Sequence, residues 1–434
     1  MDKQELFERL KKDKIEVVTL QFADLSGNLK GTNIFPRALK EAIAKGTWFD
    51  GSSIEGFARI MESDRVLQLE LGTYRVLPWE PTTARILCDI YRPDGEPLES
   101  DTRQILKRTL ARLKEKGIVY NTGAEVEFML FKISRRGELL PVDKVGYFDV
   151  SHGPGRKFLL QMMHVLEKLG MEVEMGHHEV APSQFEIDIR FADALTTADN
   201  ILTLKQAVAS IAAEYKLEAT FMPKPVAGEN GSGMHTHQSI FRDGKNAFYD
   251  GSDRYHLSKY AHNFIAGQLK HARALSAVVA PTVNSYKRLV PGFEAPVYLC
   301  HATSNRSAAI RIPHYSKGRE QSTRAELRFP DPSCNPYLAF NAMWAAGLDG
   351  MLNEIEPPSP VEEDVYHFSD EELKKREIKT LPGTLIEALN ELENDPVIHN
   401  SLQGAYDPFM RMKRQEWGEY RTQDISHWEI ERYF

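Results

Sequence analysis

The sequence predicts a globular protein of mixed helices and strands, divided into a small N-terminal region and a larger C-terminal one. Hydrophobic residues make up 42% and charged residues 27% of the 434 positions, which is ordinary for a protein with a packed core. Helical patterns alternate with short segments in which polarity changes at every residue. The turn Pro93-Asp94-Gly95, followed by the helix-capping residue type at Asp101, places a boundary near residue 100 and so divides the chain into residues 1–100 and 101–434.

The N-terminal region is predicted to contain two helices and three strands. A turn at Ser26-Gly27-Asn28 follows the first strand, and Gly46 marks the end of the second helix. The segment from Asp50 to Ser53 is predicted to be a loop. The predicted helices span residues 4–12 and 36–45, and the predicted strands span residues 17–23, 65–71 and 85–91.

The C-terminal region is predicted to alternate longer helices with short strands. Asp101 caps the first of these helices. The tail from Asp370 onward is helical and charged, and no repeat of solenoid length appears. The predicted helices span residues 102–116, 155–169, 195–215, 257–277 and 336–352.

Charge and cysteine usage indicate a protein of the cytoplasm. The formal net charge of −8 argues against a nucleic-acid-binding protein, because a surface that contacts phosphates needs a basic surplus. Cys88, Cys300 and Cys334 are far apart in the sequence, which suits reduced thiols better than disulfides or a zinc site. The charged N-terminus has no apolar signal region, and no apolar run approaches the roughly 18 residues that a membrane span requires.

Four predicted strands carry polar side chains along one face, because residues two positions apart in a strand share a side. The shared faces carry Glu125 and Glu127; Gln184, Glu186, Asp188 and Arg190; His235, His237 and Ser239; and Arg324, Glu326 and Arg328. Any single such strand is equally a half-exposed strand whose charges are solvated. Four of them together, with Glu179 after His177-His178 as a further carboxylate, predict a common site.

A site of this composition predicts divalent metal ions. Two like charges about 4 Å apart repel by roughly 4 kcal/mol at an effective dielectric constant of about 20, so clustered carboxylates need cations to remain ionised. Carboxylates with one imidazole suit Mg²⁺ or Mn²⁺, and arginines suit anionic substrates. Metal ions with arginines around a cleft are typical of phosphoryl transfer. The glycine-rich residues 228–233 lack the Lys-Ser/Thr of a phosphate-binding loop and enter a strand, so they predict only a close backbone approach to a ligand.

Long motifs around these strands closely resemble the glutamine synthetases of the prokaryotic dodecameric type. They span residues 50–57, 224–235, 284–296, 305–307 and 324–331, and the resemblance runs nearly from end to end of the chain. It implies an α+β fold with a small N-terminal β-grasp-like domain and a large C-terminal catalytic domain. The antiparallel sheet of that domain would form half-barrel active sites at the interfaces of a homo-oligomer, a dodecamer of two hexameric rings.

The resemblance also implies a reaction and its metal ions. ATP would activate L-glutamate as γ-glutamyl phosphate, and ammonia would then displace phosphate to give L-glutamine and ADP. Two or more Mg²⁺ or Mn²⁺ ions would be bound in each site. The implied ligands are Glu127, Glu179 and Glu186 for the ion near glutamate, and Glu125, His235 and Glu326 for the ion near the ATP phosphates.

The resemblance assigns the other site residues to three substrates: glutamate, the nucleotide and ammonium. Glutamate would contact Arg288, Arg328 and the backbone of Gly231, beneath a flap that ends in Glu294. The nucleotide and its transferred phosphoryl group would contact Arg306, Arg311, Arg324, His237 and Ser239. Ammonium would be bound by Asp50, Ser53, Tyr147 and Glu179, and Asp50 would accept its proton.

The sequence departs from the family pattern at positions that remove no implied ligand. Ser183 and Phe185 flank Gln184 where the family usually has Gly-Gln, often followed by His; Phe293 replaces a frequent Tyr, and His301 replaces a Trp or Tyr. Residues 374–381 lack the tyrosine-bearing insert of the adenylylated subtype. This predicts the unadenylylated subtype, in which Arg59 is the candidate sensor of feedback inhibition by glutamine.

Two other functions fit parts of this pattern. A γ-glutamyl ligase of the same superfamily would accept an amine in place of ammonia, although the intact Asp50 and Ser53 loop favours ammonium. An inert relative would act as a structural or regulatory oligomer, but it would be expected to have lost metal ligands, and all six positions are filled here.

Overall fold

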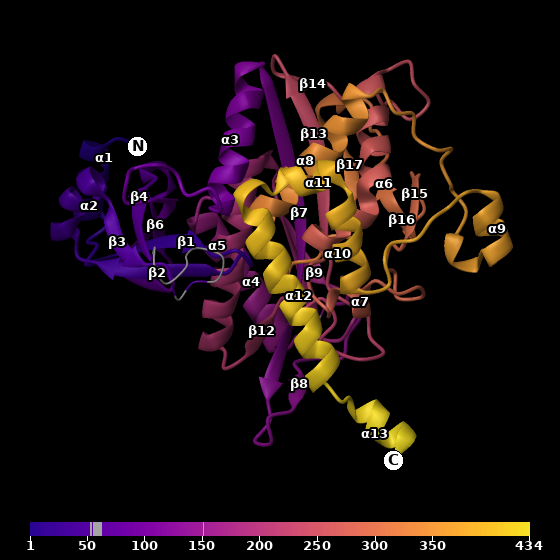
Figure 1. The fold of residues 1–434 in the computed structure, drawn as a ribbon. Helices are drawn as coiled ribbons and strands as arrows, with labels where there is room; N and C mark the ends of the chain where they lie inside the picture. The colour runs from indigo at the N-terminus through magenta and orange to yellow at the C-terminus, as the bar shows by residue number, and fades with distance from the viewer. Residues whose placement is uncertain (53, 55–62, 151) are drawn as a thin grey trace.

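The computed structural model describes residues 1–52, 54, 63–150 and 152–434. Within those residues the chain forms two β-sheets, a smaller one at the N-terminal side and a larger one in the main body (Figure 1). Each sheet has its own hydrophobic core: Leu20 and Ile86 belong to the smaller core, and Phe128 and Leu275 belong to the larger. In this described part, no helix is both long and apolar enough to cross a lipid bilayer.

The N-terminal sheet has the strand order β2-β1-β6-β4-β3, with β5 paired to β6. Strand β1 runs parallel to β6, and the other pairs are antiparallel. Its strands are β1 (Val17–Ala23), β2 (Leu29–Ile34), β3 (Thr47–Asp50), β4 (Asp64–Leu69), β5 (Arg75–Leu77) and β6 (Glu80–Tyr91). Helices α1 (Lys3–Lys12) and α2 (Leu39–Lys45) accompany it, and Gly46 ends α2 with a backbone φ of 74°. Asp50 therefore ends a strand, where a loop was predicted.

The larger sheet is built around β7 (Ile118–Ile133), in the order β15-β16-β17-β13-β7-β10-β9. Most of its pairs are antiparallel, as the half-polar strand patterns predict, and β15 with β16 is the parallel exception. The other strands on this path are β9 (Val173–His178), β10 (Gln184–Ile189), β13 (Met234–Arg242), β15 (Tyr298–Ala302), β16 (Ala308–Arg311) and β17 (Ala325–Leu327). Short strands β8 (Leu139–Pro141), β11 (Ala192–Asp193), β12 (Glu218–Thr220) and β14 (Lys245–Asn246) pair with β7 or β13.

Helices pack against the larger sheet on its apolar side. They include α3 (Thr102–Glu115) and α5 (Ala194–Glu214) against β7, α4 (Pro154–Lys168) against β9, and α6 (Lys259–Val279) against β15 and β16. Phe128 of β7 meets Phe158 of α4, and Val126, Phe185 and Ile187 are likewise buried. Because side chains alternate along a strand, the polar residues between them face the opposite side, where they are free to build a site.

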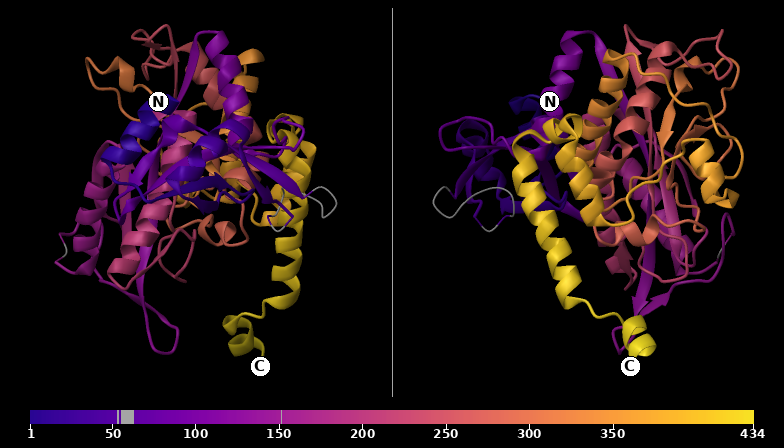
Figure 2. Two further views of the ribbon diagram at one scale, coloured as in Figure 1. Left: turned by 90° about the vertical axis from the view of Figure 1, so that its left-hand side faces the viewer. Right: turned by 45° about the vertical axis from the view of Figure 1, so that its right-hand side comes forward.

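The remaining helices form the C-terminal part. Helix α8 (Pro336–Leu352) packs so closely on α6 that a Cβ added at Gly350 would lie 2.0 Å from the Asn263 carbonyl. The others are α7 (Ser285–Arg288), α9 (Asp370–Lys375), α10 (Leu385–Asn394), α11 (Pro396–Ser401), α12 (Tyr406–Gln423) and α13 (His427–Tyr433). Figure 2 shows that α13 and the β7–β8 hairpin extend from the same end of the molecule. The predicted long helices and the helical tail are confirmed, with boundaries shifted by one or two residues.

A buried charge network joins the N-terminal sheet to helices of the main body. The Arg103 side chain of α3 donates hydrogen bonds to Asp89 of β6 at 2.6 Å and to Asp199 of α5 at 2.9 and 3.0 Å. Tyr337 of α8 donates to the same Asp199 at 2.7 Å, and Lys107 donates to Asp89. Removing one partner of such a network leaves an uncompensated buried charge, which costs about 3–5 kcal/mol. The N-terminal sheet is therefore firmly fixed to the helices of the main body.

A second buried network centres on His271 of α6. Its ring nitrogens contact Asp395, which caps α11, at 2.6 Å and Asp349 of α8 at 2.9 Å. Burial alone would lower the pKa of His271, but its hydrogen bonds to the two aspartates outweigh burial and raise it. The charged imidazole therefore joins three helices.

Replacing His271 by glutamine is expected to cost about 1.5–3 kcal/mol of unfolding free energy at pH 6. Because the folded-state pKa is raised, the contribution is complete below the unfolded pKa of about 6.5 and is lost as pH rises through the folded value. The difference between wild type and His271→Gln in denaturant unfolding, at matched protein concentration, should therefore shrink from pH 6 to pH 9. His367→Gln, which breaks an exposed pair with Asp364, is the control; a difference that grows with pH would contradict the assignment.

Candidate active site

Strand register brings the predicted acidic and imidazole side chains onto one face of the larger sheet. Glu127 of β7 lies opposite Glu186 of β10, and Glu125 lies opposite both Asp188 and His235 of β13. Along its other edge β13 pairs with β17, where His237 lies opposite Glu326. The predicted convergence of these strand faces is confirmed. Arg190 is an exception, since β10 ends at Ile189 and Arg190 pairs with the exposed Glu172.

Two adjoining cavities open on this face. The first, of about 460 Å³, is lined by His237, Ser239 and Arg324 among others. The second, of about 220 Å³, is lined by residues of β7, β9, β10 and β13 and by loops on either side. Predicted site residues that line the second cavity are Glu125, Glu127, Tyr147, Glu179, Glu186, Gly231, His235, Arg288, Glu294, Arg306, Arg311 and Arg328. Glu125 and Asp188 line both cavities, so the two spaces meet at these carboxylates.

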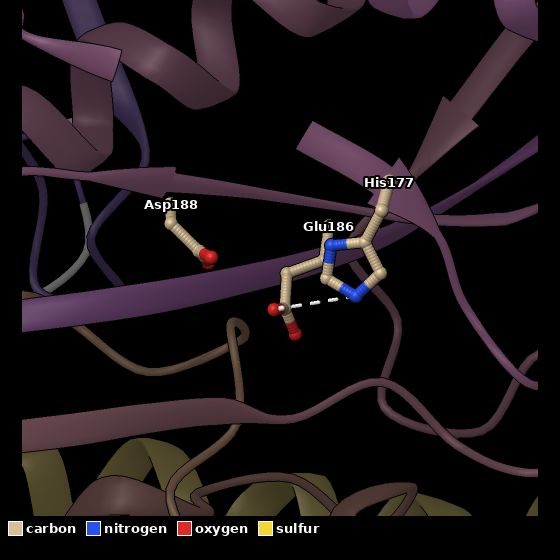
Figure 3. A group of neighbouring side chains, drawn as sticks. All are labelled: His177, Glu186 and Asp188. Atoms are coloured by element: carbon tan, nitrogen blue, oxygen red, sulfur yellow. Dashed lines mark ion pairs between the residues drawn. The ribbon is translucent and has the colours of Figure 1, made fainter. Parts of the chain in front are cut away.

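The carboxylates at the junction fit divalent cations. One donor atom each of His177, Glu186 and Asp188 lies within 4.8 Å of the others (Figure 3). Burial raises the pKa of Glu186, and the charges of Glu127 and Asp188 raise it further. In the part of the chain that the structure describes, Asp188 Oδ1 and His177 Nδ1 are buried without a hydrogen-bond partner. Bound cations would offset the repulsion and supply the missing partner for Asp188.

Hydrogen bonds set the orientation of both imidazoles of β13. His235 Nδ1 donates to the Arg328 carbonyl at 3.0 Å, which leaves Nε2 facing Glu127 at 3.4 Å. Such a backbone bond selects the tautomer whose Nε2 lone pair is free for a metal ion. His237 instead receives a hydrogen bond from Arg324 at Nδ1 and contacts Glu125 through Nε2 at 2.7 Å.

Two arginines are held by Glu326, whose side chain is fully buried. Arg311 and Arg328 donate to its two oxygens at 2.8 and 2.7 Å. Arg328 still has a buried Nε without a partner among the described residues, and it faces the second cavity. Glu326 itself is not among the described residues that line either cavity.

Arg288 of α7 reaches the second cavity in a different way. Its guanidinium donates to the carbonyls of Arg328, Phe329 and Pro330 at 3.1–3.2 Å. It lies so close to the glycine-rich loop that a Cβ added at Gly233 would be 2.5 Å from its Nη2. The glycines of this loop therefore allow the Arg288 side chain to approach the backbone closely, and the predicted approach of this backbone to a ligand stays a prediction.

Glu127 and Glu179 are each held by neighbouring groups. Glu127 Oε2 accepts hydrogen bonds from Gln184 at 2.7 Å and from the Gly233 backbone at 3.0 Å. Glu179 Oε1 accepts from His177 Nε2 at 3.0 Å. His177 was not among the predicted site residues; the pairing of β9 with β10 places it opposite Glu186, and its hydrogen bond orients Glu179.

Aromatic and charged side chains surround the mouth of the second cavity. The exposed ring of Tyr147 packs against Phe148 and His177. Burial and the charge of Glu179 raise the pKa of Tyr147, whereas Arg306 opposes this shift. Glu294 is exposed at the opposite loop, with a backbone φ of 54° in the left-handed region. These side chains form an entrance that carries both signs of charge.

Among the predicted ammonium-binding residues of the N-terminal region, the structure describes Asp50. Asp50 is exposed at the end of β3 and accepts a hydrogen bond from the Ser52 backbone at 2.8 Å, which lowers its pKa. Of the described residues, those that line the two cavities do not include Asp50. Ser53 and Arg59 lie outside the described residues.

Comparison with known proteins places this arrangement in a family. The fold and the site define a metal-dependent enzyme that handles anionic substrates. Residues 14–93 match the family model for the glutamine synthetase β-grasp domain, and residues 99–433 match that for the glutamine synthetase catalytic domain. The chain therefore belongs to the glutamine synthetase family, whose enzymes use ATP and divalent metal ions.

Individual relatives cover the whole length of the chain. It is 47% identical to the glutamine synthetase of Thermotoga maritima, over 98% of this chain and 97% of the relative. The Thermus thermophilus enzyme is also 47% identical, over 99% and 98%. Among solved structures, a GmaS/ADP complex superposes with a TM-score of 0.89 at 32% identity, covering 99% of both chains. The Plasmodium falciparum glutamine synthetase gives a TM-score of 0.90 at 26% identity, covering 100% and 99%.

Proposed function

We propose that this enzyme uses ATP to convert L-glutamate and ammonia into L-glutamine, ADP and phosphate. The observation that carries the proposal is the junction of the two cavities at Glu125 and Asp188. The second cavity adds the buried Arg328, which suits a small dicarboxylate such as glutamate. The larger first cavity has room for a nucleotide whose phosphates point toward the junction.

The carboxylates would hold divalent ions in two groups. Glu127, Glu179 and Glu186 would bind an ion near glutamate, and Glu125, His235 and Glu326 would bind one near the ATP phosphates. Mg²⁺ or Mn²⁺ suits this donor set. When bound, the ions would supply positive charge that stabilises the phosphoryl oxygens. Glu326 already binds two arginines, so its proposed part is to position Arg311 and Arg328 as well as to donate to the ion.

The first chemical step makes the side-chain carboxylate of glutamate reactive. A carboxylate oxygen attacks the γ-phosphorus of ATP, the bond to the β,γ-bridging oxygen breaks, and ADP leaves. Arg288, Arg328 and the Gly231 backbone would orient glutamate, while Arg306 would stabilise the transferred phosphoryl group. Arg311, Arg324, His237 and Ser239 would bind the nucleotide, the last three from the first cavity.

The second step forms the amide. Ammonium would bind beside Tyr147, Ser53 and Glu179, and Asp50 would accept a proton to release ammonia. The ammonia nitrogen attacks the acyl carbon, phosphate leaves with the former carboxylate oxygen, and the proton that the nitrogen loses on becoming an amide passes to the departing phosphate. The loop with Glu294 would exclude water, which would otherwise hydrolyse the acyl phosphate. Because Asp50 lines neither cavity of its own chain among the described residues, we assign it to the site of a neighbouring subunit.

The proposal extends to assembly and regulation. We propose a cytoplasmic dodecamer of two hexameric rings, with half-barrel sites at subunit interfaces and a domain division between residues 100 and 101. Residues 374–381 contain no tyrosine, which supports the unadenylylated subtype. In that subtype Arg59 is our candidate for sensing glutamine.

The proposed function is tested by measuring phosphate release with ATP, Mg²⁺ and glutamate, with and without ammonium. Ammonium-dependent release with glutamine as product, abolished in Glu326→Ala, is the expected result. A panel of small amines runs alongside, and release that requires an amine would replace this proposal with a γ-glutamyl amine ligase. No turnover by the folded, metal-loaded protein would leave only a structural or regulatory oligomer.

Substituting Gly231 by alanine is expected to raise the KM for glutamate about tenfold. The added Cβ would lie 2.4 Å from the Pro223 carbonyl and 2.8 Å from Arg288 Cγ, so the loop and the arginine must separate. Steady-state kinetics with varied glutamate measures the effect. Gly153→Ala is the control, because its Cβ would have no neighbour within 4 Å; an unchanged KM in Gly231→Ala would remove the loop from the glutamate site.

A further inference from the structure

The loop from Gly292 to Pro296, here called the flap, is contacted on one side by Lys224. The Lys224 ammonium lies 3.8 Å from the centre of the Phe293 ring, a cation–π contact. The same ammonium donates a hydrogen bond to the carbonyl of Glu229 in the glycine-rich loop. Asn230, Gly231, Phe293 and Glu294 all line the second cavity, so one lysine connects two of its walls.

The backbone of Lys224 is held by the side chain of Asn284. Its backbone N–H donates to the Asn284 side chain at 2.7 Å, and the Asn284 amide donates back to the Lys224 carbonyl at 3.0 Å. Because both backbone groups are bound to one side chain, the backbone of Lys224 is fixed relative to the segment that precedes α7. The ammonium at the end of the side chain is held separately, by the Phe293 ring and the Glu229 carbonyl.

Tyr366 contacts the flap on its other side. It lies in a short 3₁₀ turn, Val365–His367, and its hydroxyl donates to the Ala295 carbonyl at 2.6 Å. Its ring packs edge-on against Tyr298 with 5.9 Å between centres. Glu294 lies between the two contacts with a φ of 54°, a conformation that residues other than glycine rarely adopt. Contacts on both sides are therefore needed to hold the segment in this shape.

We infer that Lys224 and Tyr366 are positioning residues that clamp the flap over the second cavity. The inference rests on the proposed function, because holding the flap matters most when a water-sensitive acyl phosphate forms beneath it. With the clamp weakened, water would reach this intermediate and phosphate would be released without amide formation. Neither residue touches a reacting atom; both act through Phe293, Glu294 and Ala295.

The test compares wild type, Lys224→Met, Lys224→Arg and Tyr366→Phe as the full oligomer. Hydrogen exchange of the peptide that covers residues 290–299 should be faster in Lys224→Met and Tyr366→Phe, and should return toward wild type in Lys224→Arg, which keeps a cation over the ring. Phosphate release is measured in the absence of ammonium, and glutamine formation in its presence. The ratio of the first rate to the second should rise about fivefold in Lys224→Met. Lys287→Met is the matched control, because Lys287 makes the same kind of contact with Tyr420, at 5.1 Å.

Wild-type exchange in both Lys224→Met and Tyr366→Phe would overturn the inference, as would an equal effect of Lys287→Met. Tyr366→Phe removes a single oxygen atom, so it keeps the test decisive if Lys224→Met fails to fold. Combining Lys224→Met with Phe293→Leu should add little to the larger single effect, because both substitutions remove one contact. Exchange needs no turnover, so this result is independent of whether ammonia proves to be the substrate.

Discussion

Replacing Glu326 by glutamine is expected to lower kcat by about 1,000-fold or more. Burial alone would raise the pKa of Glu326, but electrostatic interaction with His237 and with the Arg328 guanidinium outweighs burial and lowers it, so the native side chain is a carboxylate. Glutamine preserves its shape and removes its charge. The change would weaken a proposed metal site and release Arg311 and Arg328 from the geometry they hold at 2.8 and 2.7 Å.

Two measurements check this result. Steady-state kinetics gives kcat, and titration calorimetry with Mn²⁺ gives ion affinity without any turnover. Glu172→Gln, which removes an exposed acid paired with Arg190, should leave kcat within about twofold of wild type. Retention of both kcat and Mn²⁺ affinity in a folded Glu326→Gln protein would show that Glu326 neither binds an ion nor aligns the arginines.

Asp50→Asn is expected to lower kcat about 100-fold, and mixing with Glu326→Gln subunits should restore activity. If each site combines Asp50 of one subunit with Glu326 of its neighbour, random assembly of equal amounts gives about one quarter of sites with both native groups. The structural reason is the position of Asp50 at the end of β3, the outermost strand of the N-terminal sheet, away from the described lining of the cavities.

The experiment requires co-assembly, which native mass spectrometry confirms before activity is measured. Asp64→Asn is the matched control, because Asp64 is an exposed acid opposite Asp50 in the neighbouring strand. It should retain activity alone. Mixed oligomers with no recovery would show that Asp50 acts in its own chain or takes no part in proton transfer.

The alternation of side chains along each strand predicted much of the site. Alternation assigned Glu125 and Glu127 to one face, and Glu186 with Asp188 to another, and the strand register then places these faces together. The pattern was informative because each strand is buried on one side and polar on the other. The order of the strands could not be predicted from side-chain alternation, because this pattern does not say which strands are neighbours.

Other features depend on tertiary contacts that leave little local signal. Strand β9 has the sequence Val-Glu-Met-Gly-His-His, in which only Val173 and Met175 alternate as apolar residues. This pattern is too short to predict a strand, so neither the strand nor the support of Glu179 by His177 was predicted. Arg288 was assigned to glutamate from its motif, but its hydrogen bonds to three carbonyls follow only from the position of α7 beside residues 328–330, which come after β17. A signal for His177 did exist: it immediately precedes His178 and Glu179.

The Arg103 network bears on how precisely Asp50 would be placed in the site of a neighbouring subunit. Proton transfer tolerates errors of only about 0.5 Å in the placement of the participating groups. If one subunit supplies an acid to the site of another, any movement between the two domains of the supplying subunit displaces that acid. The hydrogen bonds of Arg103 to Asp89 and Asp199 link β6 to α3 and α5 and so oppose such motion. In the proposed assembly each protomer would present Asp50 to the site of its neighbour, and the placement of Asp50 there would depend on packing far from the chemistry.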